Sequence, residues 1–223
     1  PEVLAGVRER WLAQRGADEG CAAAARALLQ AGQAPAHLAW QRARQGMEYG
    51  RQPVAAQAVG LLDPEWVAPV NAIYANPARY LNDKLTALRP RTKEFVTLAL
   101  IRLAATDLEA ARDEVQKARW RAQLTDEERG AVWAVIARRA AQRLADDALD
   151  LYAQTREQDL SEDQRAWKAR AALRAGRWDA VRDAIRAMPE AQQRDPAWAY
   201  WLGRALQARG TPEDKAQALA LWE

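Results

Sequence analysis

The pattern of hydrophobic positions predicts a chain built of α-helices. Apolar residues recur at spacings of three and four, as in Trp178, Val181, Ile185 and Met188, and this is the periodicity of one face of a helix. No stretch sustains the alternation of polar and β-branched residues that indicates a strand. Helices are expected, among other places, over residues 3–14, 21–30, 36–49, 54–62 and 92–105.

Start signals divide the pattern into short helices joined by short connections. An aspartate followed by a proline, as at Asp195 and Pro196, supplies an N-cap and then a residue suited to the first helical position. In a capping box, a Ser or Thr and an acid or amide three residues later each bond the other's backbone. Three capping boxes are expected: Ser161 with Gln164, Thr125 with Glu128, and Thr106 with Glu109.

A repeat of 34 residues underlies the last third of the chain. Trp133, Trp167 and Trp201 are spaced at this interval, and the same spacing relates Ala137, Ala171 and Ala205, and also Leu151, Ile185 and Leu219. One helix pair per 34 residues is the length of a tetratricopeptide-type unit. The sequence therefore predicts an all-α right-handed superhelix of antiparallel helical hairpins, a tetratricopeptide-like α-solenoid of roughly 10–14 helices. Residues 1–223 are expected to form a single superhelical domain.

Composition and charge exclude several classes of protein. Charged residues make up 28% of the chain and hydrophobic ones 49%, which is typical of a globular protein rather than a disordered one. The net charge of +3 is spread evenly, so no nucleic-acid surface is expected. No apolar stretch is long enough for a membrane span. Cys21 is the only cysteine, which excludes an internal disulfide, and it is expected to be a buried small side chain.

Candidate catalytic residues all have a structural explanation. His37 is the lone histidine and has no neighbouring ligands for a metal, so a position on the surface or in a first helical turn is expected. Acidic pairs, which glycoside hydrolysis needs, occur at Glu127-Glu128, Asp146-Asp147 and Glu162-Asp163. These pairs lie in or near first helical turns, where negative charge complements the helix dipole. The acids are therefore expected to stay ionised. No catalytic, cofactor-binding or metal-binding residue is assigned, and no cofactor is expected.

The tryptophans allow two interpretations. Their aromatic faces can stack on sugar rings, which would make a glycan-binding surface. Tryptophan at helical spacing in a repeat array is more often part of the core, and this is the interpretation favoured for Trp133, Trp167, Trp178 and Trp201. Arg170 and Arg204 share the faces of these tryptophans and are expected to form buried or half-buried ion pairs with acids of neighbouring helices.

Several strings together resemble the superhelical region of soluble lytic murein transglycosylases. They are WKARAALRAGRWDAVRDAIRAM from Trp167, the run DPAWAYW continuing into GRAL, FVTLALIRLAATDLEAA from Phe95, CAAAARALLQAG and WQRARQGMEYG. The resemblance covers most of the chain. In that family the superhelix is a platform, and a separate C-terminal lysozyme-like domain with a catalytic glutamate performs the chemistry. The family's Glu-Ser motif is not found in this chain.

The resemblance implies that the chain is a non-catalytic fragment of a longer periplasmic enzyme that lacks its catalytic domain here. Such a parent cleaves the bond between N-acetylmuramic acid and N-acetylglucosamine and leaves 1,6-anhydromuropeptides during cell-wall turnover. The implied partners are peptidoglycan glycan strands, reached through the parent enzyme, and cell-wall or divisome proteins. The alternative from another class is a tetratricopeptide-like scaffold for protein interactions with no enzymatic partner domain.

Overall fold

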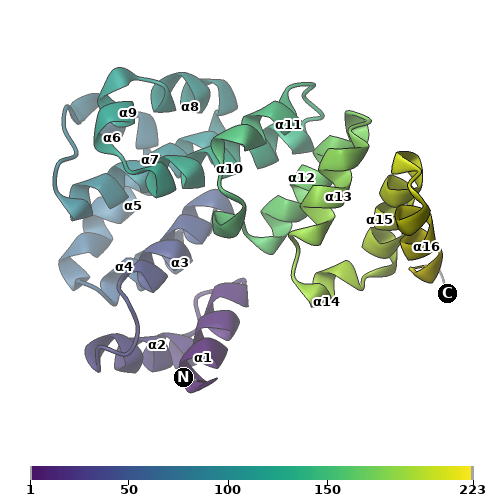
Figure 1. Cartoon of the computed structure of the whole chain (residues 1–223). Coiled ribbons are helices and arrows are strands. Elements are labelled where there is room, and N and C mark those ends of the chain that lie inside the picture. Colours follow the sequence, from purple (N-terminus) through teal and green to yellow (C-terminus); the bar gives the residue numbers. More distant parts are fainter. Residues whose placement is uncertain (1, 222–223) are drawn as a thin grey trace. The chain divides into compact units, whose positions relative to one another are not determined.

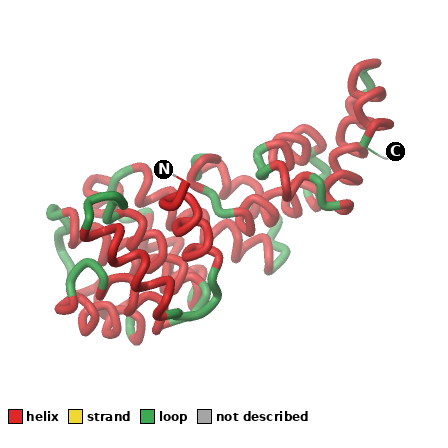
Figure 2. Tube along the Cα trace, turned by 90° about the horizontal axis from the view of Figure 1, so that it is seen from below, coloured by secondary structure: helices red, strands yellow, loops and turns green. Residues whose placement is uncertain are grey.

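The computed structural model describes residues 2–221, and every regular element in that range is a helix. Figure 1 shows the elements with their labels, and Figure 2 shows helices joined by loops. In chain order they are α1 (Glu2–Ala13), α2 (Glu19–Gln30), α3 (His37–Glu48), α4 (Gln52–Gly60), η1 (Pro64–Trp66), α5 (Val67–Ala75), α6 (Pro77–Asp83), α7 (Pro90–Thr106), α8 (Leu108–Val115), α9 (Ala118–Gln123), α10 (Asp126–Gln142), α11 (Ala148–Leu151), η2 (Tyr152–Gln154), η3 (Glu157–Asp159), α12 (Glu162–Arg174), α13 (Trp178–Arg186), α14 (Glu190–Gln193), α15 (Pro196–Arg209) and α16 (Pro212–Ala220).

The all-α, solenoid-like class is confirmed, and the helices are more numerous than expected. Residues 2–221 contain 16 α-helices and three 3-10 helices, against the roughly 10–14 that a 34-residue repeat predicts. The excess comes from short pieces such as α11 and α14, each of four residues. These single turns have no long apolar face, so a search for helical periodicity does not separate them from loops.

The chain divides into two compact units, Pro1–Val132 and Trp133–Glu223. In the first unit α7 is the central helix, and it packs against α3, α5, α6 and α8. Nine of its side chains are buried: Phe95, Val96, Thr97, Leu98, Ala99, Leu100, Ile101, Leu103 and Ala104. Burial of apolar surface on this scale is the main source of stability for the unit.

Helices α3 and α4 approach closely at Gly46. A Cβ placed on Gly46 would lie 2.6 Å from the backbone nitrogen of Ala55 and 2.8 Å from its Cβ. No carbon atom tolerates such a distance, so the pairing of α3 with α4 requires glycine at this position.

In the second unit, consecutive helices pack in the order α12, α13, α15 and α16. Their core consists of Ala166, Ala169, Ala172, Val181, Ala184, Ile185, Met188, Trp198, Leu202, Ala205, Leu206 and Ala218. The predicted apolar stripe of α13 is confirmed, since Val181, Ile185 and Met188 are buried and Trp178 packs on the core as a half-buried residue. Small alanines facing larger side chains allow these helices to approach closely.

Of the three sets of equivalent positions in the 34-residue repeat, two agree in burial and one does not. Trp133, Trp167 and Trp201 are all half-buried. Ala137, Ala171 and Ala205 are all buried. In the third set, Ile185 is fully buried, Leu151 is half-buried and Leu219 is 61% exposed. The alanine position therefore has a constant role in helix packing, whereas the burial of the leucine or isoleucine position changes from repeat to repeat.

The predicted capping boxes formed in two of three places. Ser161 and Gln164 bond each other's backbone at the start of α12, and Thr125 and Glu128 do so at the start of α10. At α8 the prediction was wrong by one residue, because Asp107 is the N-cap and accepts from the N–H of Ala110. The Thr106 hydroxyl donates instead to carbonyls of α7.

The structure also bears on the membrane question. Within residues 2–221, none of the helices combines the length and the apolar character that a transmembrane span requires.

Candidate functional site

The most unusual chemical group of the first unit is a buried arginine shared by two carboxylates. Arg44 on α3 contacts Glu94 on α7 and Glu127 on α10, and we call these three residues the Arg44 cluster. Nη2 of Arg44 donates to both oxygens of Glu94 at 3.0 Å, and Nη1 donates to Oε1 of Glu127 at 2.5 Å. The Arg44 side chain is only 8% exposed, that of Glu94 12% and that of Glu127 28%.

Two residues near members of the Arg44 cluster in the sequence, Trp40 and Phe95, belong to a group of packed aromatic rings. Trp40 lies one helical turn before Arg44 and stacks on Trp66 with ring centroids 5.5 Å apart. Phe95, which follows Glu94 directly, meets both indoles edge-on at 6.0 and 6.1 Å. Trp40 and Phe95 are themselves buried.

Burial raises the pKa of Glu94 to about 7, although Arg44 partly offsets this effect. The carboxylates of Glu128 and Glu127 act in the same direction as burial, because a third negative charge is unfavourable beside one guanidinium. For Arg44 burial alone would lower the pKa, but its two acidic partners raise it, so the guanidinium stays charged. The expectation that the acids of this chain all lie at caps or on polar faces and stay ionised is therefore wrong for Glu94.

A carboxyl group that titrates near neutral pH can in principle act as a general acid or base. In Glu94, however, both carboxylate oxygens face the guanidinium of Arg44. The three residues form a salt-bridge network between helices, to which α3, α7 and α10 each contribute one residue. Sequence reasoning missed both Arg44 and Glu94. The hydrophobic pattern could have indicated that Glu94 is buried, since it precedes the buried Leu98 and Ile101 at spacings of four and seven on the apolar face of α7.

The predicted acidic pairs lie at or near helix starts, but their side chains do not all act as caps. Glu128 completes its capping box, while its neighbour Glu127 belongs to the Arg44 cluster. Asp163, in the first turn of α12, pairs with Arg138 of α10 at 2.5 Å. Asp147 occupies the N-cap position of α11 without a side-chain capping bond, so the capping interpretation was wrong there.

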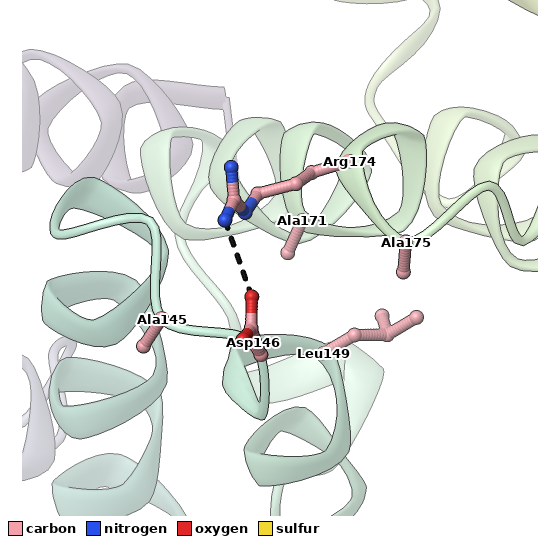
Figure 3. A pocket seen from close by; sticks show the side chains of 6 residues that line it. All are labelled: Ala145, Asp146, Leu149, Ala171, Arg174 and Ala175. Atoms are coloured by element: carbon pink, nitrogen blue, oxygen red, sulfur yellow. Dashed lines mark hydrogen bonds and ion pairs between the residues drawn. The ribbon is translucent and has the colours of Figure 1, made fainter.

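The acidic pair Asp146-Asp147 also borders a small surface pocket in the second unit. Figure 3 shows this pocket, in which Asp146 and Arg174 face one another 3.2 Å apart across a floor of short apolar side chains. Its volume is about 280 Å³, and it is lined by Ala145, Asp146, Leu149, Ala171, Arg174 and Ala175. Asp146 is almost fully exposed and Arg174 half exposed, so water competes for both charges. No serine, threonine, cysteine or histidine is among the residues that line the pocket.

The repeat tryptophans are less buried than predicted. Trp133, Trp167, Trp178 and Trp201 are all half-buried; Trp178 and Trp201 pack on the edge of the core. On α12 the buried positions are Ala166, Ala169 and Ala172, and Trp167 lies about 100° around the helix from Ala166. The core prediction therefore holds in part, and each of these indoles also keeps some surface in contact with solvent.

Arg170 and Arg204 do not form the expected buried ion pairs. Both are exposed. The guanidinium of Arg170 lies 4.9 Å from the ring of Trp167 and 5.0 Å from that of Trp198, an arrangement that we call the Trp–Arg stack. Arg204 instead donates to the hydroxyl of Tyr200 at 2.9 Å. Cation–π attraction therefore replaces the predicted charge pairing at both positions.

The remaining candidates have structural positions. His37 is exposed at the first residue of α3, as predicted. Cys21 is half-buried rather than buried, and its sulfur accepts from Nε2 of Gln14 at 2.9 Å. Among the described residues, no three histidines, cysteines or acids come together in a group that could hold a metal ion.

Comparison with known proteins identifies the fold. No family model matches the chain, and no curated protein matches it. Among solved structures, the chain is similar to an inactive mutant of lytic transglycosylase Slt from Pseudomonas aeruginosa, with 24% identity and a TM-score of 0.57 over 96% of this chain. It is also similar to the 70-kDa soluble lytic transglycosylase from Escherichia coli, with 19% identity and a TM-score of 0.53 over 97% of this chain.

A third similar structure is a complex of the 70-kDa soluble lytic transglycosylase with bulgecin A, with 19% identity and a TM-score of 0.52 over 99% of this chain. The chain spans only 36%, 36% and 35% of these three proteins in the order P. aeruginosa, bulgecin complex, E. coli. The described chain thus shares its helical fold with about a third of each of these soluble lytic transglycosylases.

Proposed function

We propose that this chain is the non-catalytic superhelical platform of a peptidoglycan lytic transglycosylase. The observation that carries the proposal is the fold likeness, which extends over 96% of this chain but over only 36% of the P. aeruginosa enzyme. The quoted strings of the sequence resemble the superhelical region of the same family. The parent protein would cleave the bond between N-acetylmuramic acid and N-acetylglucosamine in the periplasm, and a separate domain would supply the catalytic acid.

The chemistry of the described acids supports a platform rather than an active site. General acid catalysis needs a carboxyl group with a raised pKa beside a groove that holds the sugar. Burial raises the pKa of Glu94 to about 7, and both of its carboxylate oxygens bind Arg44. The acids of the surface pocket and of the helix starts are solvated or engaged in caps and ion pairs.

The Trp–Arg stack is the surface on which we expect glycan to be held, if the platform itself contacts the strand. Indole faces pack on sugar rings, and an exposed guanidinium donates hydrogen bonds to carboxylate groups. Trp167 is half-buried and Arg170 exposed, so both are reachable from solvent. The pocket between Asp146 and Arg174 lacks an aromatic wall and fits a sugar less well.

The deciding experiment incubates purified murein sacculi with this 223-residue protein and, separately, with the full product of its parent gene. Release of 1,6-anhydromuropeptides by the parent alone supports the proposal. Release by the 223-residue protein, abolished by Glu94→Gln, overturns it and makes Glu94 a catalytic residue. If the parent releases no anhydro product, the tetratricopeptide-like scaffold without an enzymatic partner becomes the better assignment.

A binding assay tests the finer part of the proposal. Cosedimentation of the 223-residue protein with sacculi is compared for the wild type, the double variant Trp167→Ala with Arg170→Ala, and the control Arg174→Ala in the pocket. Loss of binding in the double variant alone supports glycan contact at the Trp–Arg stack. Equal binding in all three proteins shows that the stack does not contact glycan, without affecting the platform assignment.

A further inference from the structure

The loop between α6 and α7 displays the two most exposed large hydrophobic side chains of the described chain. Leu85 is 76% exposed and Leu88 is 74% exposed. An isolated exposed leucine is common and needs no explanation. Two leucines three residues apart in one six-residue loop form a local apolar patch, and such patches often mark interaction surfaces.

The backbone of this loop is anchored, so the leucines are not exposed through fraying. Ala87, between the two leucines, is fully buried, and its N–H donates to Oε1 of Gln123. At the start of the loop, the guanidinium of Arg119 donates to the carbonyls of Lys84 and Leu81 at 3.1 and 3.2 Å. A rigid loop that presents apolar side chains has already lost the backbone entropy that binding would otherwise cost.

The segment around the leucines is strongly basic. Residues 84–93 read KLTALRPRTK and contain four cations, namely Lys84, Arg89, Arg91 and Lys93, and no acid, although the whole chain has a net charge of only +3. The nearest acids in sequence are already paired, Asp83 with Arg79 and Glu94 with Arg44. The charge of this segment is therefore not neutralised by its neighbours in sequence.

Two cations of the segment lie against aromatic rings. The ammonium group of Lys84 lies 5.5 Å from the Tyr80 ring centroid. Burial raises the pKa of Tyr80 to about 12, and the positive charge of Arg91 acts in the opposite direction. The guanidinium of Arg91 also lies 5.8 Å from the ring centroid of Trp66. In the sequence, Lys84 directly precedes Leu85 and Arg89 directly follows Leu88, so a cation stands on each side of the two leucines along the chain.

We propose that the loop Lys84–Arg89 is a docking surface for an anionic lipid bilayer, with Leu85 and Leu88 entering the boundary between head groups and acyl chains. Charge complementarity selects this occupant. Two short apolar side chains enter only a shallow layer, and the surrounding lysine and arginine side chains match the phosphates of that layer. The proposal goes beyond the platform function and does not depend on it, since neither the Trp–Arg stack nor the Arg44 cluster takes part.

The test is flotation of the 223-residue protein with vesicles. We expect binding to vesicles of phosphatidylglycerol mixed with phosphatidylcholine in equal parts, and much weaker binding to pure phosphatidylcholine. Binding should decrease as salt screens the cations. The double variant Leu85→Ser with Leu88→Ser should lower partitioning by at least about tenfold, because two leucine side chains are removed from the bilayer. Each of Lys84→Gln and Arg89→Gln should lower it about fivefold.

A matched control uses leucines that are exposed elsewhere. Leu144 is 58% exposed and Leu219 is 61% exposed, both in the second unit, and the double variant Leu144→Ser with Leu219→Ser should bind like the wild type. The substituted leucines and Arg89 are exposed and Lys84 is half-buried, and circular dichroism verifies that each variant keeps its helices. An equal loss in the control variant, equal binding to neutral and anionic vesicles, or no binding to either vesicle would each overturn the proposal.

Discussion

The carboxylate of Glu94 and the guanidinium of Arg44 meet at 3.0 Å in the interior of the first unit, although 50 residues separate them in the chain. Glu127 binds the same guanidinium from a third helix. One guanidinium thus pairs with two carboxyl groups, that of the largely buried Glu94 and that of the half-buried Glu127. The negative charge of Glu127 contributes to the raised pKa of Glu94. Stability should therefore depend on pH in a direction opposite to that of an ordinary salt bridge.

The first prediction concerns that pH dependence. Glu94 has a pKa of about 7 in the folded protein against an ordinary value of 4.5, so between these values the folded state binds more protons than the unfolded state. The free energy of unfolding therefore falls as pH rises through this interval, by on the order of 2–3 kcal/mol from this group. Glu94→Gln should remove that contribution. The measurement is urea denaturation of both proteins from pH 5 to pH 8.

The informative quantity is the difference between wild type and Glu94→Gln, because other groups also titrate over this range. The advantage of the wild type should be largest near pH 5 and should shrink by pH 8. An advantage that grows with pH would show that Glu94 is ionised throughout and that Arg44 outweighs the effect of burial.

The second prediction concerns Arg44 itself. Arg44→Met keeps most of the side-chain volume but leaves Glu94 and Glu127 buried without a cation, which should cost about 3–5 kcal/mol of unfolding free energy. The matched control is Arg174→Met, which breaks the exposed pair with Asp146. That change should stay close to experimental error, as is usual for solvated pairs. Similar losses in the two variants would mean that the Arg44 cluster is open to water.

The third prediction tests the contact between α3 and α4. Gly46→Ala places a methyl group against the backbone of Ala55, where the distance would be 2.6 Å, and the resulting strain should cost about 1–3 kcal/mol. Gly6→Ala in α1 is the control, because a Cβ there meets nothing within 4 Å. In a helix interior that change should stabilise by about 0.5–1 kcal/mol. Thermal unfolding of both variants measures the two shifts, and a stabilised Gly46→Ala protein would be inconsistent with the described packing.

The fourth prediction ranks two tryptophans of the second unit. Trp198 is 8% exposed and belongs to the core, so Trp198→Ala should cost about 3–5 kcal/mol. Trp167 is half-buried, and Trp167→Ala should cost clearly less, about 1–2 kcal/mol, since less apolar area leaves the interior. Chemical denaturation gives both values. A reversed order would show that Trp167 is the deeper residue of the pair.

Local signals in the sequence predicted most of the fold. Helix starts depend on residues three positions apart, such as Ser161 and Gln164, and these interactions form with little regard to the rest of the chain. The error at Thr106 has a local cause as well. The adjacent Asp107 competes for the same cap and places its carboxylate closer to the N–H of Ala110.

The charged cluster could not be predicted in the same way, because it depends on contacts between distant helices. Arg44 lies between the buried Trp40 and Met47 at spacings of four and three, so its position on an apolar helix face could be predicted from the sequence. Its partners Glu94 and Glu127 were not, since no local rule relates residues 50 and 83 positions apart. Likewise, Arg170 was expected to find an acid, and only the fold shows that two indoles occupy its surroundings.

The Arg44 cluster also limits how the first unit can be divided. In a solenoid whose repeats contact only their neighbours, terminal repeats can be removed one at a time with a proportionate loss of stability. Here a deletion that removes α3 would also remove Arg44, and it would leave Glu94 and Glu127 without the cation that they share. Residues 37–132 should consequently behave as one cooperative block that resists trimming, so modular shortening or repeat exchange would have to begin outside it.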